Sequence, residues 1–340
     1  MGILLAQFLL FFILSKSTFF VQLMERFFEL QKDFHQRLFA PFSFSAGDVF
    51  YISLTFVLLF ISFKAFQKKT RQMNVLRLLI ILNIFYFIYQ LFWGMMYFQE
   101  PILDKLPKEE VTEKEVKTLI NIYLERCKKT RILVKENEHG VFQLKNLGEI
   151  KMQILKNQNQ IPLSISSKEP TQIISLKPSI FRGIMSYTGI LGYYNPFTAE
   201  AQYNPELPST SLPFTLAHES AHQLGFAREQ EANFIGYLIG KKSENLDLKY
   251  STEYYVLKSL LNSLAEKEPN YVKSVLENYS APMKRDRKAE LDFRKKHAGL
   301  LDVLFAYTND LFLKSNQQEG SITYSYFIDL MVRYERVNPQ

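Results

Sequence analysis

The chain has 340 residues, of which 47% are hydrophobic and 30 are Phe. This length allows one large or two ordinary domains. The net charge of +7 alone would suggest nucleic-acid binding. However, the basic residues of the C-terminal part alternate with acidic ones, which is typical of a solvated helix face, so we expect no nucleic-acid partner. A single cysteine, Cys127, excludes an intrachain disulfide and a cysteine-rich metal site.

Three apolar segments lie in the first hundred residues, at 2–24, 47–66 and 75–98. Each reaches the approximately 20 residues that a membrane-spanning helix needs. Lys16 is the one charged residue of the first segment, and a lysine near the end of a span can extend its side chain to the interface. We therefore predict a membrane domain over residues 1–98 with three transmembrane helices, whose partner is the lipid bilayer.

The loop between the second and third segments determines the predicted orientation. It is basic and carries no acidic residue, with Lys64, Lys68, Lys69, Arg71 and Arg77. Short basic loops stay on the cytoplasmic side of a membrane. The N-terminus is then inside, and everything after the third segment lies outside. We expect a multi-pass protein of the bacterial cytoplasmic membrane, with its soluble part in the periplasm or at the cell surface.

Residues 99–340 are predicted to form this soluble domain. Apolar residues recur at helical spacing over 109–130, after Leu147, and in five stretches from 251 onward. Residues 170–210 are rich in Gly, Pro, Tyr and Asn, which favours loops and short strands. The expected fold class is mainly α: three transmembrane helices followed by a mostly helical α+β domain with a small sheet.

The main chemical signal is the pentad at residues 218–222. His218 and His222 stand one helical turn apart on one face, so both rings can reach the same ion, and zinc accepts nitrogen ligands. Glu219 is then the expected general base, which takes a proton from a zinc-activated water. Ser211 is a plausible N-cap for the helix, and Gly225 stands where the helix would end.

A third zinc ligand is expected a few residues downstream. Glu229 is followed by Ala232 and Asn233, a spacing that suits a second helix packed closely on the first. The alanine would allow the close approach, and the Asn233 side chain could accept a hydrogen bond from His218 and orient that ligand. Glu231 stays open as the alternative third ligand. The predicted cofactor is zinc.

Two resemblances extend this reading. The pentad with its downstream glutamate resembles the gluzincin class of zinc metallopeptidases, although Asn233 replaces the more common Asp. Segments throughout the chain are similar to an uncharacterised family of bacterial membrane proteins, domain of unknown function 3810; they lie at 41–48, 93–98, 192–201, 217–237 and 313–326. The resemblance implies the membrane topology, a zincin-like domain and a zinc-peptidase-like site, but no substrate.

From these observations we predict a membrane-anchored zinc metallopeptidase that hydrolyses peptide bonds in a peptide or protein substrate. Candidate donors to the transition state are Tyr324, Tyr326 and Arg285. Residues 189–204 are a candidate edge strand for the substrate, with an aromatic structural loop as an equal alternative. Two other functions stay open: a non-catalytic zinc-binding membrane sensor or assembly protein, and a hydrolase of a non-peptide amide in the cell envelope.

Overall fold

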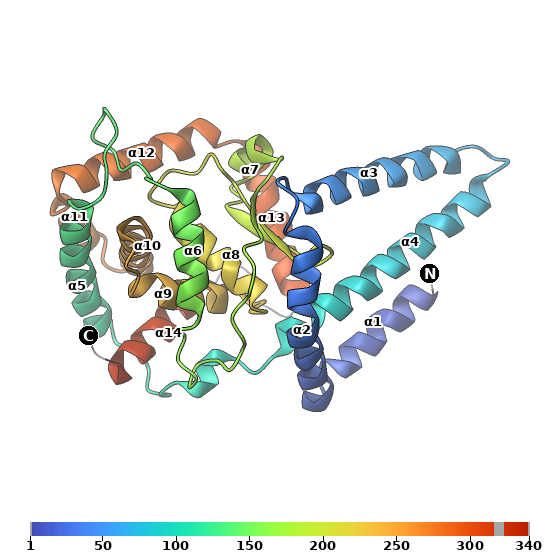
Figure 1. The fold of residues 1–340 in the computed structure, drawn as a ribbon, viewed down its shortest axis with the longest axis horizontal. Helices are drawn as coiled ribbons and strands as arrows, with labels where there is room; N and C mark the ends of the chain where they lie inside the picture. Colours follow the sequence, from blue (N-terminus) through green and yellow to red (C-terminus); the bar gives the residue numbers. More distant parts are fainter. Residues whose placement is uncertain (1, 316–322, 339–340) are drawn as a thin grey trace.

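A computed structural model describes residues 2–315 and 323–338. A globular body, built mostly of helices, carries two long helices that extend from one side of it (Figure 1). Only one small sheet, of three short strands, lies among the described residues. The predicted class, mainly α with a small sheet, is confirmed at this level.

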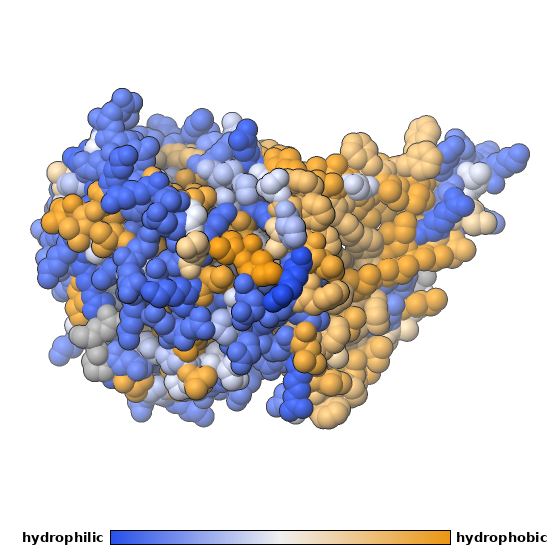
Figure 2. Space-filling model, in the orientation of Figure 1, coloured by the Kyte–Doolittle hydropathy of each residue, from blue (hydrophilic) through white to orange (hydrophobic). Residues whose placement is uncertain are grey.

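The two extended helices are α3 (Ala46–Ala65) and α4 (Arg71–Phe92), and both are long and apolar enough to cross a membrane. They form a hairpin whose outer surface is mostly apolar (Figure 2). The second predicted span agrees with α3. The third ends earlier than predicted, because residues after Phe92 turn into a short 3-10 helix, η1 (Gly94–Phe98).

The segment predicted as the first span is not one continuous helix, and this corrects the sequence analysis. It divides into α1 (Gly2–Leu14) and α2 (Thr18–Phe39), which are bent by 100°. At the break the Ser15 hydroxyl donates to the carbonyl of Phe12 at 2.8 Å, and the charged Lys16 follows. At 1.5 Å per residue α1 is roughly 20 Å long, less than a bilayer core. Among the residues that the structure describes, two apolar helices could thus span a membrane, or three if the bent pair counts as one span.

The globular body is centred on α8 (Leu212–Gln223), in which every residue except His218 is buried. Its neighbours α9 (Glu229–Lys241), α10 (Leu246–Leu264) and α6 (Leu147–Gln158) pack around it. The remaining helices form the outer layer: η2 (Ile102–Lys105), α5 (Glu113–Arg131), α11 (Pro269–Glu277), α12 (Ala281–His297), α13 (Leu300–Ser315) and α14 (Thr323–Val337). The helices predicted from 251 onward are all present. Part of the C-terminal segment quoted for the family resemblance, residues 316–322, lies outside the described residues.

The sheet contains β1 (Leu176–Pro178), β2 (Gly192–Asn195) and β3 (Glu200–Tyr203) in the order β1-β3-β2. β1 is parallel to β3, and β2 is antiparallel to it, with Gly192 opposite Tyr203. β2 therefore forms one edge of the sheet. A short helix that the sequence analysis did not predict, α7 (Arg182–Thr188), connects β1 to β2.

Two buried carboxylates join the sheet to the start of α3. Glu200 of β3 accepts hydrogen bonds from the backbone N–H groups of Ala46 and Gly47, at 3.2 and 2.6 Å. Asp48 accepts from the backbone N–H of Ile180 at 2.7 Å, and also from the hydroxyl of Tyr193 in β2. The apolar hairpin is thus fixed to the sheet through hydrogen bonds to two buried carboxylates.

Candidate metal centre

The helix that carries the pentad begins and ends where the sequence predicted. Ser211 occupies the N-cap position, but its hydroxyl donates to Glu290 at 3.0 Å instead of capping the helix. At the other end Gly225 adopts φ +93°, and its N–H donates to the carbonyl of His222 at 2.9 Å. A left-handed residue here turns the chain back sharply, and glycine adopts that conformation without steric cost.

This turn leads directly into α9, which packs tightly against α8. Ala232 is fully buried, as expected for a residue that allows close approach. Gly236, one turn further on, was missed by the sequence analysis: a Cβ there would lie 3.0 Å from the backbone nitrogen of His218. The repeat of small residues at a spacing of four was the available signal. The close packing places Glu229, the first residue of α9, opposite the two histidines.

Three potential ligand atoms meet at this point. The Nε2 atoms of His218 and His222 are 3.1 Å apart, and they lie 3.3 and 3.7 Å from the two carboxylate oxygens of Glu229. Zinc–nitrogen bonds of about 2.0–2.1 Å at a tetrahedral angle would separate two ligand nitrogens by roughly 3.3 Å. These three residues are the one group of His, Cys, Asp or Glu with metal-binding geometry among the described residues.

The hydrogen bonds of the two rings also fit a cation. The Nδ1 of His218 donates to the side-chain oxygen of Asn233 at 2.9 Å, which is the contact expected from the sequence. The Nδ1 of His222 donates to the carbonyl of Phe226 at 2.7 Å. With a proton on each Nδ1, the neutral rings direct two Nε2 lone pairs at each other. Only a proton or a cation between them makes that arrangement favourable, and the donor set suits zinc.

Glu219 lies beside this cluster in a buried position, with 2% of its surface exposed. Its Oε2 atom is buried without a hydrogen-bond partner among the described residues. A Cβ on Gly192 of β2 would overlap with this carboxylate, so the edge strand passes directly against it. Burial raises the pKa of Glu219 to about 8. At pH 7 this carboxyl group would be mostly protonated, and a cation bound beside it would favour the ionised form that a general base needs.

The protonation states of two of the three potential ligands, His222 and Glu229, also suit a metal. Burial lowers the pKa of His222 to about 4, so its ring is neutral at pH 7. Burial alone would raise the pKa of Glu229, but its contact with His218 and the nearby imidazoles lower it to about 2. Burial alone would lower the pKa of His218, but Glu229 beside it raises this pKa, so a proton held by His218 would have to leave when a metal binds. A neutral imidazole and an ionised carboxylate are the forms that bind metal.

A family model described as "Protein of unknown function (DUF3810)" matches residues 24–332 of this sequence. The chain belongs to the DUF3810 family. No curated protein and no solved structure matches the chain. The family assignment therefore supports the resemblance over most of the chain, and only the residues of this DUF3810 protein indicate its chemistry.

Glu231, the alternative third ligand, has other partners in this DUF3810 chain. Its carboxylate accepts from the backbone N–H of Ile102 at 2.8 Å and pairs with Arg228 at 3.0 Å. Arg228 also donates to the carbonyl of Gln99 at 2.6 Å. Glu231 thus fixes the start of α9 to the chain segment that follows the hairpin, and it lies outside the metal-ligand cluster.

Of the three predicted transition-state donors, Arg285 lies away from the metal-ligand cluster, and the two tyrosines lie on helix α14. Arg285 of α12 donates to the carbonyl of Gly140 at 2.7 Å and to Glu136 at 3.1 Å, so the structure does not bring it to the cluster. Tyr324 and Tyr326 lie on α14, which packs against α9 and α10. The side chain of Tyr324 is outside the described part, and that of Tyr326 is partly buried.

Aromatic residues distant in sequence form one wall of the site. The ring of Trp93, at the end of α4, meets the ring of His222 edge-on, with 5.8 Å between centroids. Tyr194 of β2 also packs against Trp93, with 4.4 Å between the ring centroids. The sequence analysis included Trp93 in the third apolar segment and gave no sign of its contact with the pentad.

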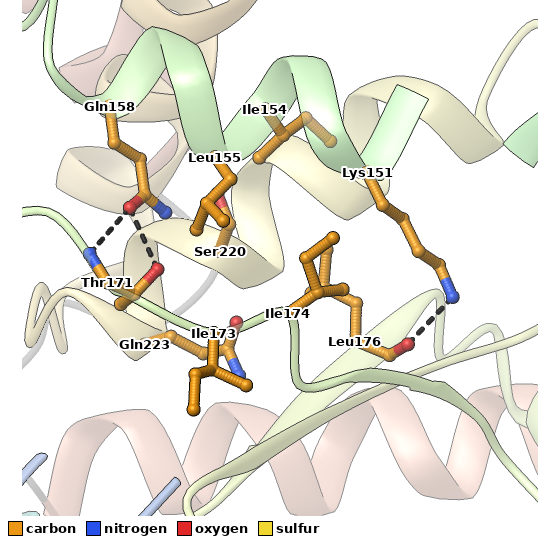
Figure 3. A pocket seen from close by; sticks show the side chains of 10 residues that line it. All are labelled: Lys151, Ile154, Leu155, Gln158, Thr171, Ile173, Ile174, Leu176, Ser220 and Gln223. Atoms are coloured by element: carbon orange, nitrogen blue, oxygen red, sulfur yellow. Dashed lines mark hydrogen bonds between the residues drawn. The ribbon is translucent and has the colours of Figure 1, made fainter. Parts of the chain in front are cut away.

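A small cavity lies near α8 and is separate from the metal centre (Figure 3). Its volume is about 10 Å³, and Ser220 and Gln223 of α8 are among its lining residues. Across it, the Gln158 side chain accepts two hydrogen bonds from Thr171, and Lys151 donates to the carbonyl of Leu176 (Figure 3). This volume accommodates about one water molecule, so the cavity is too small for a substrate.

Proposed function

We propose that this protein is a membrane-anchored, zinc-dependent metallopeptidase. Zinc would be held by His218, His222 and Glu229, and Glu219 would be the general base. The observation that carries the proposal is the convergence of two Nε2 lone pairs and one carboxylate beside a second, buried carboxylate with an unpartnered oxygen. A zincin-like character of the domain is part of this proposal.

The residues suit hydrolysis better than a purely structural metal site. Structural zinc sites are closed by four protein ligands, whereas catalytic sites have three and leave one position open. When bound, zinc would polarise a carbonyl group and lower the pKa of water to about 7. Glu219 would accept a proton from the attacking water and then donate it to the leaving amine. Its buried surroundings keep that proton transfer away from bulk solvent.

The edge strand β2 supports a peptide as the substrate. A peptide can bind by adding a strand to an exposed sheet edge, where main-chain hydrogen bonds align it. β2 is at the edge of the sheet, and its first residue, Gly192, lies against Glu219. A peptide on this edge would pass its carbonyl groups close to the general base.

We further propose that the site lies outside the cytoplasmic membrane of a bacterium. The basic loop at 64–77 is at the far tip of the hairpin, and the globular body is at its base (Figure 1). If the basic tip is cytoplasmic, the body lies on the opposite side. The proposed orientation follows from α3 and α4 alone, and so it does not depend on the bent α1–α2 pair.

The test compares the zinc-loaded wild type with Glu219→Gln, using Glu244→Gln at an exposed surface position as a control. We expect all three proteins to bind zinc equally, and only Glu219→Gln to lose hydrolysis of a mixed peptide pool. Bound zinc with no hydrolysis of peptides or other amides by the wild type would instead support the non-catalytic sensor or assembly protein. Hydrolysis of envelope amides without cleavage of peptides would support a hydrolase of a non-peptide amide in the cell envelope.

A further inference from the structure

The segment that leaves the membrane hairpin forms part of the metal centre. Trp93 contacts His222, as described above, and the side chain of Gln99 donates to the carbonyl of Gly225 at 3.1 Å. Three residues further on, the N–H of Ile102 donates to Glu231 at the start of α9. Residues 93–102 thus hold both the histidine helix and the helix that presents Glu229.

Helix α2 holds the same turn from another direction. Phe28 of α2 is 1% exposed and packs with Trp93 and Met96. Its ring lies so close to Gly225 that a Cβ there would be 2.8 Å from it. The turn between α8 and α9 is therefore enclosed by α2 and by the end of the hairpin. The metal centre sits at the base of the apolar hairpin, and these contacts fix its position there.

The strand beside Glu219 leads into the hairpin as well. After β2 the chain turns at Phe197, whose ring packs against Phe50 of α3 and Phe85 of α4, at 5.3 and 5.2 Å. The carbonyl of Phe197 also lies 3.0 Å from Nε2 of His35 in α2. A peptide aligned on β2 would therefore have one end close to the base of the two apolar helices.

The surface around this base exposes many apolar side chains. Helix α2 buries Phe28 and Gln36 against the body, and its opposite face exposes large apolar side chains, among them Phe19, Leu30, Phe34 and Leu38. Near β2, Leu191 is 48% exposed and directly precedes Gly192. The apolar surface of the hairpin continues onto parts of helix α2, next to hydrophilic patches (Figure 2). Exposed apolar surface that is continuous with membrane-spanning helices suits contact with the lipid interface.

From this geometry we propose that the substrate is a polypeptide held at the membrane surface, namely the stretch next to the lipid anchor or transmembrane helix of another protein. The inference rests on the proposed peptidase function. A freely soluble peptide needs no such placement, whereas a tethered one is presented at the level of the site by its anchor. Tethering also raises the local concentration of the substrate.

The experiment uses the full chain, loaded with zinc, in phosphatidylglycerol–phosphatidylcholine vesicles. The probe is a pool of randomised peptides of about 30 residues, which reach about 100 Å when extended. One half of the pool carries a palmitoyl anchor at one end and the other half carries none. Mass spectrometry maps the cut positions. We expect anchored peptides to be cut roughly tenfold faster, with cuts concentrated in the ~10 residues, or about 35 Å, next to the anchor.

A second measurement does not depend on turnover. In Glu219→Gln, a photo-crosslinker near the anchor should attach to β2 or residues 93–102, and one at the free end should not. Leu30→Glu, at an 85% exposed site on α2, should slow cleavage of anchored peptides several-fold and leave that of soluble ones unchanged. Ile132→Glu is the matched control, at a 73% exposed site at the end of α5, on the side away from the hairpin.

The outcomes are distinguishable. Equal cleavage of anchored and free peptides, with cuts spread along the whole length, would overturn the inference and leave the peptidase proposal intact. If the zinc-loaded wild type cuts neither pool, the proposed function is contradicted and the inference is overturned with it.

Discussion

The two ring nitrogens of each pentad histidine have different tasks. Nδ1 donates to a fixed oxygen, on Asn233 for His218 and on Phe226 for His222, and Nε2 is left to face Glu229. Such contacts fix both the tautomer and the orientation of a metal ligand. Contacts within the chain thus orient both rings, and the zinc affinity of the site should depend on these outer contacts.

Asn233→Leu should weaken zinc binding by about 10–100-fold, because it removes the acceptor for the Nδ1 proton of His218. Asn233→Asp should strengthen binding, since a charged acceptor makes the imidazole more basic. Competition titration against a zinc chelator measures both changes. Asn159→Leu, at an exposed position in α6's C-cap, serves as the control. Equal zinc affinity in wild type and Asn233→Leu would contradict the proposed role.

Lys151 provides a prediction about pH. Burial, together with repulsion from Lys177, lowers its pKa to about 8, from about 10.5 in an unfolded chain. Between these values the unfolded state binds more protons, so raising the pH favours the folded state. The stability of the wild type should therefore rise relative to Lys151→Met as pH increases from 8 toward 10.5. Thermal unfolding of both proteins across this range would test the sign. A stability difference that stays constant with pH, or a wild type that loses stability relative to Lys151→Met as pH rises, would refute the prediction.

At the residue scale, the local sequence was sufficient to predict the site wherever spacing along one helix defines the geometry. The pentad, Gly225 and the hydrogen bond to Asn233 were all predictable in this way. Gly192 and Trp93 were not, because their contacts with Glu219 and His222 depend on how distant segments pack. Glu229 and Glu231 could be ranked only by helical face, and the structure separates them through the partners of Glu231.

At the element scale, the apolar runs predicted α3 and α4 well but failed at the N-terminus. There, Ser15 bonds to its own helix and Lys16 is charged, so the chain breaks instead of continuing as one span. Helix α7 was also missed, because its short segment lies in a region dominated by turn-forming residues. The strands are only three or four residues long, too short to show a clear alternation.

Strand β2 supplies the prediction at this scale. Gly192→Ala would place a methyl group against the Glu219 carboxylate and displace the general base or the strand. We expect peptide hydrolysis to fall by at least about tenfold, which corresponds to 1.4 kcal/mol of transition-state stabilisation. Zinc content should be unchanged, because none of the three proposed ligands is touched. Gly183→Ala is the matched control, since nothing lies within 4 Å of its added Cβ. Full activity in Gly192→Ala would argue against the assigned position of Glu219.

At the scale of the whole molecule, the proposed location of the site requires the basic tip and the globular body to lie on opposite sides of a membrane. A reporter active only outside the cytoplasm, fused after residue 340, should be active. A cysteine introduced at Lys68 should be protected from an impermeant thiol reagent until the cells are opened. The native Cys127 is buried and should not react. A reporter active only in the cytoplasm would reverse the proposed orientation.

We propose that His218, His222 and Glu229 bind one zinc ion, and X-ray absorption with elemental analysis of purified, zinc-supplied protein tests this assignment. We expect one zinc per chain, with two imidazole nitrogens at about 2.0–2.1 Å and carboxylate oxygen in the coordination shell. The ion should be lost in His218→Ala and in Glu229→Ala, and it should be retained in Glu231→Ala if that variant folds. A wild type without zinc, or zinc that persists unchanged in His218→Ala, would contradict the assignment.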